Sequence, residues 1–380
     1  MAMGGSFDWQ AVRRELTVVF EGSTASRTLR CSPLPEVPIT TGALAATIQS
    51  VVPGETVLLI GSDQTRKTGL DRLLPVLLDG FAAHGVPATD ISLLIACGAH
   101  RQPDAEELAR VVGPAAERLN GRIHLHNAFD SDCEAVGITS RGTPVRINRR
   151  ALDADAVIPI GAVLFHYFAG MSGGAKSVVP GVAAATTIAA NHSLTISREL
   201  AAPDPNVRIG RLEGNPVSDD LWEATGMVAV RSAIQTVLAG DGRLVGLFAG
   251  PLHDAHRQAC DVARRAFGCP LDGRSDLVIA AAGVALNWIQ SHKSLVNASL
   301  ATKPDGVIIL HAPCPEGVGS ESFEYWLSVG DAAAIIRGIG ETADINSQTA
   351  LSTLTRGRQA ILISDLPTGT IRRMGMTPAA

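Results

Sequence analysis

The segment from His166 to His192 combines residue types that could bind a metal and form a covalent bond. Between the two histidines stands the sequence Ser-Gly-Gly-Ala-Lys at residues 172–176. Paired glycines let a backbone approach a ligand closely, and a lysine amine desolvated in such a setting is a candidate for covalent attachment. Imidazole binds nickel, zinc, copper and iron, although no third histidine or cysteine stands at the spacing of a closed zinc site. The alternative interpretation is a tight turn between core histidines.

A second polar segment, residues 61–68, follows the strand-like run Thr56–Ile60 and precedes a helical pattern. In open α/β sheets, ligands bind at the carboxyl ends of strands, where helix N-termini offer free N–H groups to anions. Thr65, Thr68 and the amides after them could hold a phosphate, and Arg66 could pair with a carboxylate through two hydrogen bonds. The alternative is a capped turn with solvated charges.

His100 directly follows another strand-like run, Ile91–Cys97, and a strong helix start follows at Asp104. Because parallel strands end at one edge of a sheet, we expect His100 near Asp63 and Arg66. A single histidine at such a place is more often structural, but two strand ends that present His, Asp and Arg together favour a structural and a catalytic role equally.

Gln290 and Lys293 are three residues apart on a predicted helix and therefore share one of its faces. Facing a cleft, they could hold a hydroxyl group and a carboxylate; otherwise they belong to a solvated helix face. His253 and His256 have the same spacing, but their helix is polar, and we expect both side chains to be exposed.

The elements that position these residues alternate between short apolar runs and amphipathic stretches, which predicts an α/β protein with mostly parallel sheets. The strand-like runs are Thr56–Ile60, Ile91–Cys97, Ala156–Ile160, Leu244–Ala249, Leu277–Ala282, Gly306–Ala312 and Gln359–Ser364. The helical patterns are Leu70–Ala83, Asp104–Val112, Asp219–Leu238 and Ala255–Phe267. Pro75 is expected to kink the first helix or to mark its true start. The more polar region 122–149 is expected to form short strands and turns.

A domain boundary is expected near Cys269–Ser275, where a Pro- and Gly-containing stretch precedes a new strand. We therefore predict two α/β domains. Residues 1–272 would form the cofactor-binding and catalytic domain, and residues 273–380 would complete the substrate site. The active site is expected in the cleft between them.

Composition excludes several classes of function. Charged residues make up only 18% of the 380 residues, and the net charge is −5 with no Lys/Arg-rich run, so no nucleic-acid partner is expected. No apolar run is long enough to span a membrane, and the N-terminus lacks the pattern of a signal peptide. The six cysteines form no CxxC pair. We expect reduced core thiols in a cytoplasmic protein.

In their order along the chain, these motifs resemble those of the nickel-dependent lactate racemase family, and the resemblance extends over most of the chain. Asp63-Gln64-Thr65-Arg66 is similar to the family's Asp-x-x-Arg, and Gly98-Ala99-His100-Arg101 to its Gly-Thr-His-Arg. His166, Gly173-Gly174-Ala175-Lys176, Pro180-Gly181 and Asn191-His192 are similar to its His, Gly-Gly-x-Lys, Pro-Gly and Asn-His. Gln290 to Lys293 looks like its Gln-x-x-Lys.

The resemblance implies a nickel-pincer nucleotide, a pyridinium-3,5-bisthiocarboxylic acid mononucleotide with nickel, attached covalently to Lys176. His192 would be the protein ligand to nickel, and His100 and His166 the paired acid/base groups. The residues expected around the cofactor are Asp63, Thr65, Ser172, Gly173 and Gly174. Those expected to position the substrate are Arg66, Gln290 and Lys293. Enzymes of cofactor biosynthesis are implied partners.

The implied activity is racemisation or epimerisation of a small-molecule 2-hydroxy acid by reversible hydride transfer to the cofactor, with the two histidines moving the hydroxyl proton. The alternative is a cofactor-binding or carrier protein of the same fold without turnover. Ala99, Lys67 and Ile289 depart from the family pattern and alter the expected substrate pocket. Lys67 points to a second anionic group on the substrate.

Overall fold

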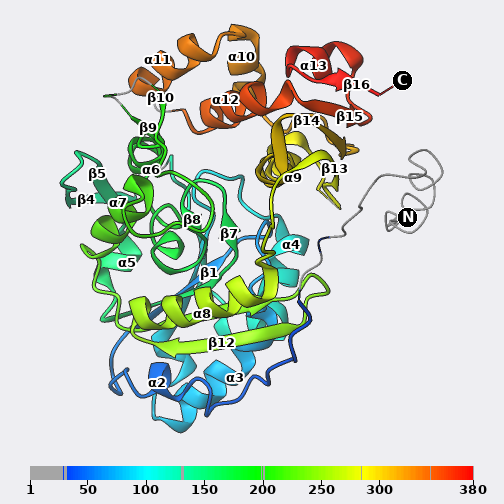
Figure 1. Ribbon diagram of the computed structural model, residues 1–380. Helices are drawn as coiled ribbons and strands as arrows, with labels where there is room; N and C mark the ends of the chain where they lie inside the picture. The colour runs from blue at the N-terminus through cyan, green and yellow to red at the C-terminus, as the bar shows by residue number, and fades with distance from the viewer. Residues whose placement is uncertain are drawn as a thin grey trace. The chain divides into compact units, whose positions relative to one another are not determined.

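The computed structural model of the chain describes residues 29, 32–129, 132–197, 199, 202–283, 285–342 and 344–379. The chain divides into two compact units. One is Cys31–Gly268, and the other includes Cys269–Ala380. Each unit is built from α-helices and β-strands (Figure 1).

The first unit is organised around a sheet with the strand order β12-β11-β6-β1-β2-β3. All neighbouring pairs are parallel except β11 and β12, which are antiparallel. The strands are β1 Val57–Ser62, β2 Ile91–Ala96, β3 Ile123–Leu125, β6 Ala156–Ala162, β11 Ala233–Leu238 and β12 Leu244–Gly250. The alternation of apolar runs and helical patterns therefore predicted the class of this sheet correctly.

The central strands are apolar along their whole length because both faces of the sheet are covered. Leu58 and Leu59 are neighbours on β1 that point to opposite faces, and both are buried. Residues of α2, α3 and the 3₁₀ helix η2 form a core against one face. On the other face α8 packs against β11 and β12. The helices involved are α2 Ala45–Ile48, α3 Leu70–Ala83, α4 Ala105–Val112, η2 Gly113–Leu119 and α8 Leu252–Phe267.

Helix α3 begins at Leu70, so Pro75 does not mark its start and lies inside it. The buried residues Leu70, Leu73, Leu74 and Leu77 recur at the spacing of one helix face. Burial of this stripe against the sheet offsets the backbone hydrogen bond that proline cannot donate.

The single helix predicted for Asp219–Leu238 is wrong. The chain forms α7 Pro216–Thr225 and then, after a turn, strand β11 Ala233–Leu238. Gly226 stands at the C-cap of α7. The later residues are drawn into the sheet because β11 is paired on both sides, with β6 and β12, and its side chains are buried. This tertiary pairing overrides the helical pattern.

Short elements fill the loops at the sheet edges, and the expected short strands of region 122–149 are confirmed. β4 and β5 form an antiparallel hairpin, as do β7 with β8 and β9 with β10. The remaining elements of this unit are η1 Ala88–Asp90, β4 Cys133–Ile138, β5 Pro144–Asn148, α5 Arg149–Asp153, β7 Phe165–His166, β8 Gly170–Met171, η3 Gly174–Ser177, α6 Ala185–Ser193, β9 Ile196–Ser197 and β10 Ala202–Pro203.

The second unit contains a parallel sheet of strand order β13-β14-β15-β16 with helices between its strands. This parallel sheet with intervening helices agrees with the α/β class predicted for this part of the sequence. Its elements are β13 Ser275–Ala281, α9 Trp288–Ala301, β14 Thr302–His311, α10 Glu321–Val329, α11 Ala332–Thr342, α12 Ile345–Gly357, β15 Ala360–Ile363, α13 Thr368–Arg373 and β16 Thr377–Pro378.

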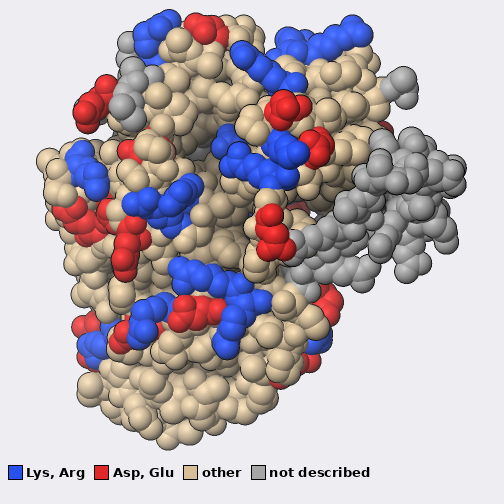
Figure 2. Space-filling view, viewed as in Figure 1, with Lys and Arg blue, Asp and Glu red and all other residues tan. Residues whose placement is uncertain are grey.

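Four of the cysteines, Cys97, Cys133, Cys260 and Cys314, are buried free thiols as expected, whereas Cys269 is exposed. Cys31 lies outside the described residues. No helix in the described part of the chain is long and apolar enough to cross a membrane. On the face shown in Figure 2, acidic and basic side chains are interspersed.

Candidate active site

The candidate site lies at the carboxyl edge of the first unit's sheet. Strand β1 pairs in parallel with both β2 and β6, so the loops that follow these strands emerge together. These loops carry Asp63, His100 and the glycine segment before Lys176. The N–H of Gly98 donates to the carbonyl of Gly181 at 3.0 Å and ties the second loop to the third. The topology thus gathers residues that are far apart in sequence.

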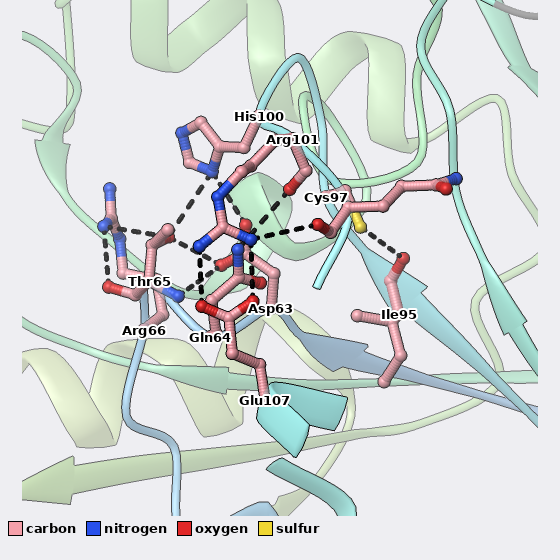
Figure 3. A network of polar contacts seen from close by, with 10 residues as sticks. Asp63, Gln64, Thr65, Arg66, Ile95, Cys97, His100, Arg101 and Glu107 are labelled. Atoms are coloured by element: carbon pink, nitrogen blue, oxygen red, sulfur yellow. Dashed lines mark hydrogen bonds and ion pairs between the residues drawn. The ribbon is translucent and has the colours of Figure 1, made fainter. Parts of the chain in front are cut away.

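Asp63 and His100 form a hydrogen-bonded pair. Nδ1 of His100 lies 2.8 Å from Oδ2 of Asp63, and the backbone N–H and hydroxyl of Thr65 donate to Oδ1 at 3.0 and 2.6 Å. Figure 3 shows the three side chains pointing toward one another. The Asp63 side chain is 2% exposed and that of His100 is 51% exposed. The carboxylate is therefore buried beneath an imidazole that reaches the surface.

The carboxyl of Asp63 is held in its ionised form. Burial raises its pKa, but the hydrogen bond and charge of His100 and the two hydrogen bonds from Thr65 outweigh burial, so the pKa of Asp63 lies below its usual value. An ionised carboxylate only accepts hydrogen bonds, so it fixes the proton of His100 on Nδ1. Nε2 of a neutral His100 then carries the lone pair that can accept a proton.

Two neighbouring arginines differ sharply in their partners. Arg101 donates two hydrogen bonds to Glu107, at 2.7 and 2.6 Å. Within the described part of the chain, Arg66 has no acidic partner, and its guanidinium reaches only the carbonyl and hydroxyl oxygens of Thr65. Lys67 is exposed beside it. Arg66 is therefore the arginine available to an anionic ligand.

The other half of the site is arranged around the ring of Phe168. The ring centroids of His166 and His192 lie 4.4 and 4.8 Å from that of Phe168, both in edge-on contact. Nζ of Lys176 lies 5.1 Å from the same centroid, within the range of a cation–π contact. Phe168 comes from the turn between β7 and β8 and is a residue that the sequence motifs did not single out.

His192 is a buried neutral imidazole on α6. Burial, followed by the charges of Lys176 and His100, lowers its pKa to about 3. The preceding residue, Asn191, anchors α6 by donating to the Val217 carbonyl at 3.1 Å and to Asp220 at 2.9 Å. A neutral nitrogen on a fixed helix is what a metal ligand requires.

His166 is oriented differently from His100. The backbone N–H of Ala169 donates to Nδ1 of His166 at 3.2 Å. Because Nδ1 is the acceptor, a neutral His166 carries its proton on Nε2. The two histidines therefore have opposite tautomers, with the lone pair of His100 on Nε2 and the proton of His166 on Nε2.

The donor set fits an organometallic group better than a metal bound by protein alone. Among the described residues, no three or more His, Cys, Asp or Glu side chains lie close enough to hold a metal ion. His192 provides one neutral nitrogen, and the amine of Lys176 lies near the same Phe168 ring. A metal at His192 would need its remaining ligands from outside this set of side chains.

The structure places the remaining predicted residues as follows. The hydroxyl of Ser172 donates to the carbonyl of Ala162 and accepts from the N–H of Leu164, both at 2.8 Å, so it is engaged within its own loop. Gln290 and Lys293 lie in the second unit on α9, which Asn287 caps by accepting the N–H of Gln290 at 3.2 Å. Their role at the substrate stays a prediction.

The expected exposure of His256 is wrong, whereas that of His253 is confirmed. His256 is 3% exposed, because it faces the glycine loop at residues 172–174. Its Nε2 lies 3.0 Å from the carbonyl oxygen of Ser172. A polar helix can still bury one polar residue that finds a hydrogen-bond partner. No pattern in the sequence marks that partner, since it lies 84 residues away.

The fold and these side chains define an α/β protein with a candidate ligand site at the carboxyl edge of a mostly parallel sheet. Residues 36–202 match the family described as Lactate racemase N-terminal domain. Lactate racemase of Thermoanaerobacterium thermosaccharolyticum is 31% identical over 275 residues, and that of Lactiplantibacillus plantarum is 32% identical over 275 residues. Residues 36–202 thus match the N-terminal domain of the lactate racemase family, and the chain is similar to these two enzymes.

The matches differ in extent. The alignments cover 71% and 72% of this chain and 62% and 63% of the two relatives, so the chain spans less than two thirds of their length. The apoprotein structure of the Thermoanaerobacterium enzyme superposes with a TM-score of 0.80 and 25% identity, over 92% of this chain and 86% of that one. A Thermotoga maritima protein, 17% identical with a TM-score of 0.69 over 89% and 90%, shares the fold.

Proposed function

We propose that this protein is a racemase or epimerase of a 2-hydroxy acid that uses a nickel-pincer nucleotide attached to Lys176. The proposal rests on one arrangement above all: the amine of Lys176 and the neutral imidazole of His192 meet at the ring of Phe168. The Asp63–His100 pair at the same sheet edge supplies an acid/base group. Relatives named lactate racemase support the reaction class.

In this proposal, Lys176 holds the cofactor through its amine, and His192 binds the nickel. When bound, the cofactor would supply an electron-poor ring, the chemistry that reversible hydride transfer from the substrate's Cα requires. The residues proposed to lie around it are Asp63, Thr65, Ser172, Gly173 and Gly174.

The chain's own residues move the hydroxyl proton. Nε2 of His100 accepts that proton, and the carboxylate of Asp63 stabilises the resulting imidazolium. His166 serves the opposite enantiomer, whose hydroxyl lies on the other side. Loss of the hydroxyl proton and of the Cα hydrogen with its electron pair converts a 2-hydroxy acid into a 2-keto acid. Because that acid is planar at C2, the hydrogen can return to either face.

Three side chains position the substrate. The guanidinium of Arg66 binds the substrate carboxylate through paired hydrogen bonds. Gln290 and Lys293, which lie on α9, are proposed to bind the substrate as well. Lys67, exposed next to Arg66, favours substrates with a second anionic group. The proposed partners of the protein are the cofactor-biosynthesis enzymes. The proposed location of the protein is the cytoplasm.

The test is to co-express the protein with cofactor-synthesis enzymes and to measure the intact mass and bound nickel of the purified chain. Lys176→Ala is the matched control, because it removes the attachment amine. An adduct on Lys176 together with nickel is expected in the wild-type protein only. Absence of both from the wild-type protein would refute the cofactor assignment.

The loaded protein is then screened for change of configuration at C2 of lactate, malate, longer 2-hydroxy acids and sugar acids. Racemisation or epimerisation of at least one compound is expected. A loaded protein that leaves every compound unchanged would favour the alternative of a cofactor carrier without turnover.

A further inference from the structure

His256 lies directly against the glycine loop that precedes Lys176. Its Nε2 is 3.0 Å from the carbonyl oxygen of Ser172. A Cβ atom added to Gly174 would lie 2.7 Å from two ring atoms of His256, closer than real Cβ contacts. The imidazole therefore occupies the space that a side chain at residue 174 would need.

Gln235, on strand β11, holds the same loop from a second direction. Its Oε1 accepts the N–H of Gly174 at 2.8 Å, and its Nε2 donates to the carbonyl of Ile234 at 3.1 Å. A Cβ atom on Gly173 would lie 2.6 Å from that Oε1. Both Gln235 and His256 are buried.

The two glycines are required for backbone geometry as well as for space. Gly173 and Gly174 have φ values of 68° and 54°, in the left-handed region that other residues rarely adopt. This turn leads straight into the short helix η3, where the N–H of Lys176 donates to the carbonyl of Gly173 at 3.0 Å. The orientation of Lys176 therefore depends on how the two glycines are held.

The chemistry of the contact agrees with a neutral imidazole. Burial is the main reason that the pKa of His256 falls to about 4, so at neutral pH the ring keeps one proton. A carbonyl oxygen only accepts hydrogen bonds, so that proton lies on Nε2 and points at Ser172. Lys176, Trp222 and His256 also line one small cavity.

We propose that His256 and Gln235 are positioning residues for the attachment of the cofactor. They clamp residues 172–174 so that the amine of Lys176 is presented beside His192. The paired glycines serve this clamp of protein atoms, rather than the close approach of a ligand. The inference rests on the proposed function in one respect, the use of Lys176 as the attachment point.

The first test measures the clamp in the cofactor-free protein by hydrogen–deuterium exchange of the peptide that covers residues 172–178. His256→Phe keeps an aromatic ring but cannot donate to Ser172, and His256→Gln restores a donor of similar reach. Exchange is expected to be about tenfold faster in His256→Phe, the effect of losing one buried hydrogen bond, and near wild type in His256→Gln. Gln258→Ala, at an exposed position two residues along the same helix, is the matched control and should leave exchange unchanged.

The second test measures the fraction of chains that carry an adduct on Lys176 after co-expression with cofactor-synthesis enzymes. We expect this fraction to fall severalfold in His256→Phe and to recover in His256→Gln. Wild-type exchange and adduct levels in His256→Phe would overturn the inference. So would an equal rise of exchange in the distant helix α3, because that outcome describes general destabilisation. If the wild-type protein acquires no adduct, the proposed function fails, while the exchange result still decides whether the clamp exists.

Discussion

Nδ1 of His100 is hydrogen-bonded to Oδ2 of Asp63 at 2.8 Å, and this contact decides which nitrogen of His100 can accept a proton. The carboxylate is buried and ionised, so the proton of a neutral His100 stays on Nδ1. Nε2 is left for the substrate. The chemical state of His100 is thus set by a residue on a different loop.

Asp63→Asn should lower racemase activity by about a hundredfold or more, the contribution that a general base makes. The amide cannot stabilise a charged imidazole, and it no longer fixes the tautomer. Racemisation rates of the nickel-loaded variant give the measurement, with bound nickel as the control for loading. Activity within twofold of wild type at equal loading would contradict the role of Asp63.

The opposite tautomers of the two histidines can be measured directly. In the cofactor-free protein labelled with ¹⁵N-histidine, we expect His100 to be protonated on Nδ1 and His166 on Nε2, because Asp63 and the Ala169 N–H impose these states. Long-range ¹H–¹⁵N NMR spectra distinguish the two nitrogens. The same tautomer at both positions would show that one of these hydrogen bonds does not set the ring.

Arg66→Gln and Arg101→Gln form a matched pair. Losing a charged hydrogen-bond donor to the substrate carboxylate should raise KM about tenfold or more in Arg66→Gln. Arg101 is occupied by Glu107, so its substitution should leave KM near wild type and lower only the melting temperature. Steady-state kinetics and thermal unfolding separate the two effects. An equal rise of KM in both variants would argue against the assignment of Arg66.

Burial of His256 should make stability depend on pH. Its pKa is lowered from 6.5 to about 4 in the folded protein, so between these values the unfolded chain binds more protons. The contribution of neutral His256 to the free energy of unfolding is therefore present in full above pH 6.5. It falls by about 3 kcal/mol as the pH drops towards 4. Below pH 4 both states are protonated and this contribution changes no further.

Urea unfolding of the cofactor-free protein at pH 7 and pH 4.5 gives the measurement. His192 and His292 also have lowered pKa values and add to the slope, so the wild-type protein is compared with His256→Gln. The variant should lose less stability between the two pH values. An unchanged difference between them would show that His256 is not buried as a neutral ring.

The sequence predicted the sheet because its physical signals are local. The apolar runs at β1, β2 and β6 are continuous, as expected for strands covered on both faces. It failed at Asp219–Leu238, because the helical pattern there continues into residues that the sheet recruits by pairing with β6 and β12. That competition is decided between segments distant along the chain.

The candidate residues follow the same division. The types and order of Asp63, His100, Lys176 and His192 were determined by the sequence itself, and with them the class of chemistry the site can support. Only the tertiary structure decided that Asp63 sets the tautomer of His100 and that Phe168 joins Lys176 to His192. The tertiary structure also decided that His256 contacts the carbonyl of Ser172 in the glycine loop. The physical reason is that a hydrogen bond or ring contact needs a few ångströms of proximity, which the packing of loops at the sheet edge creates and residue spacing does not encode.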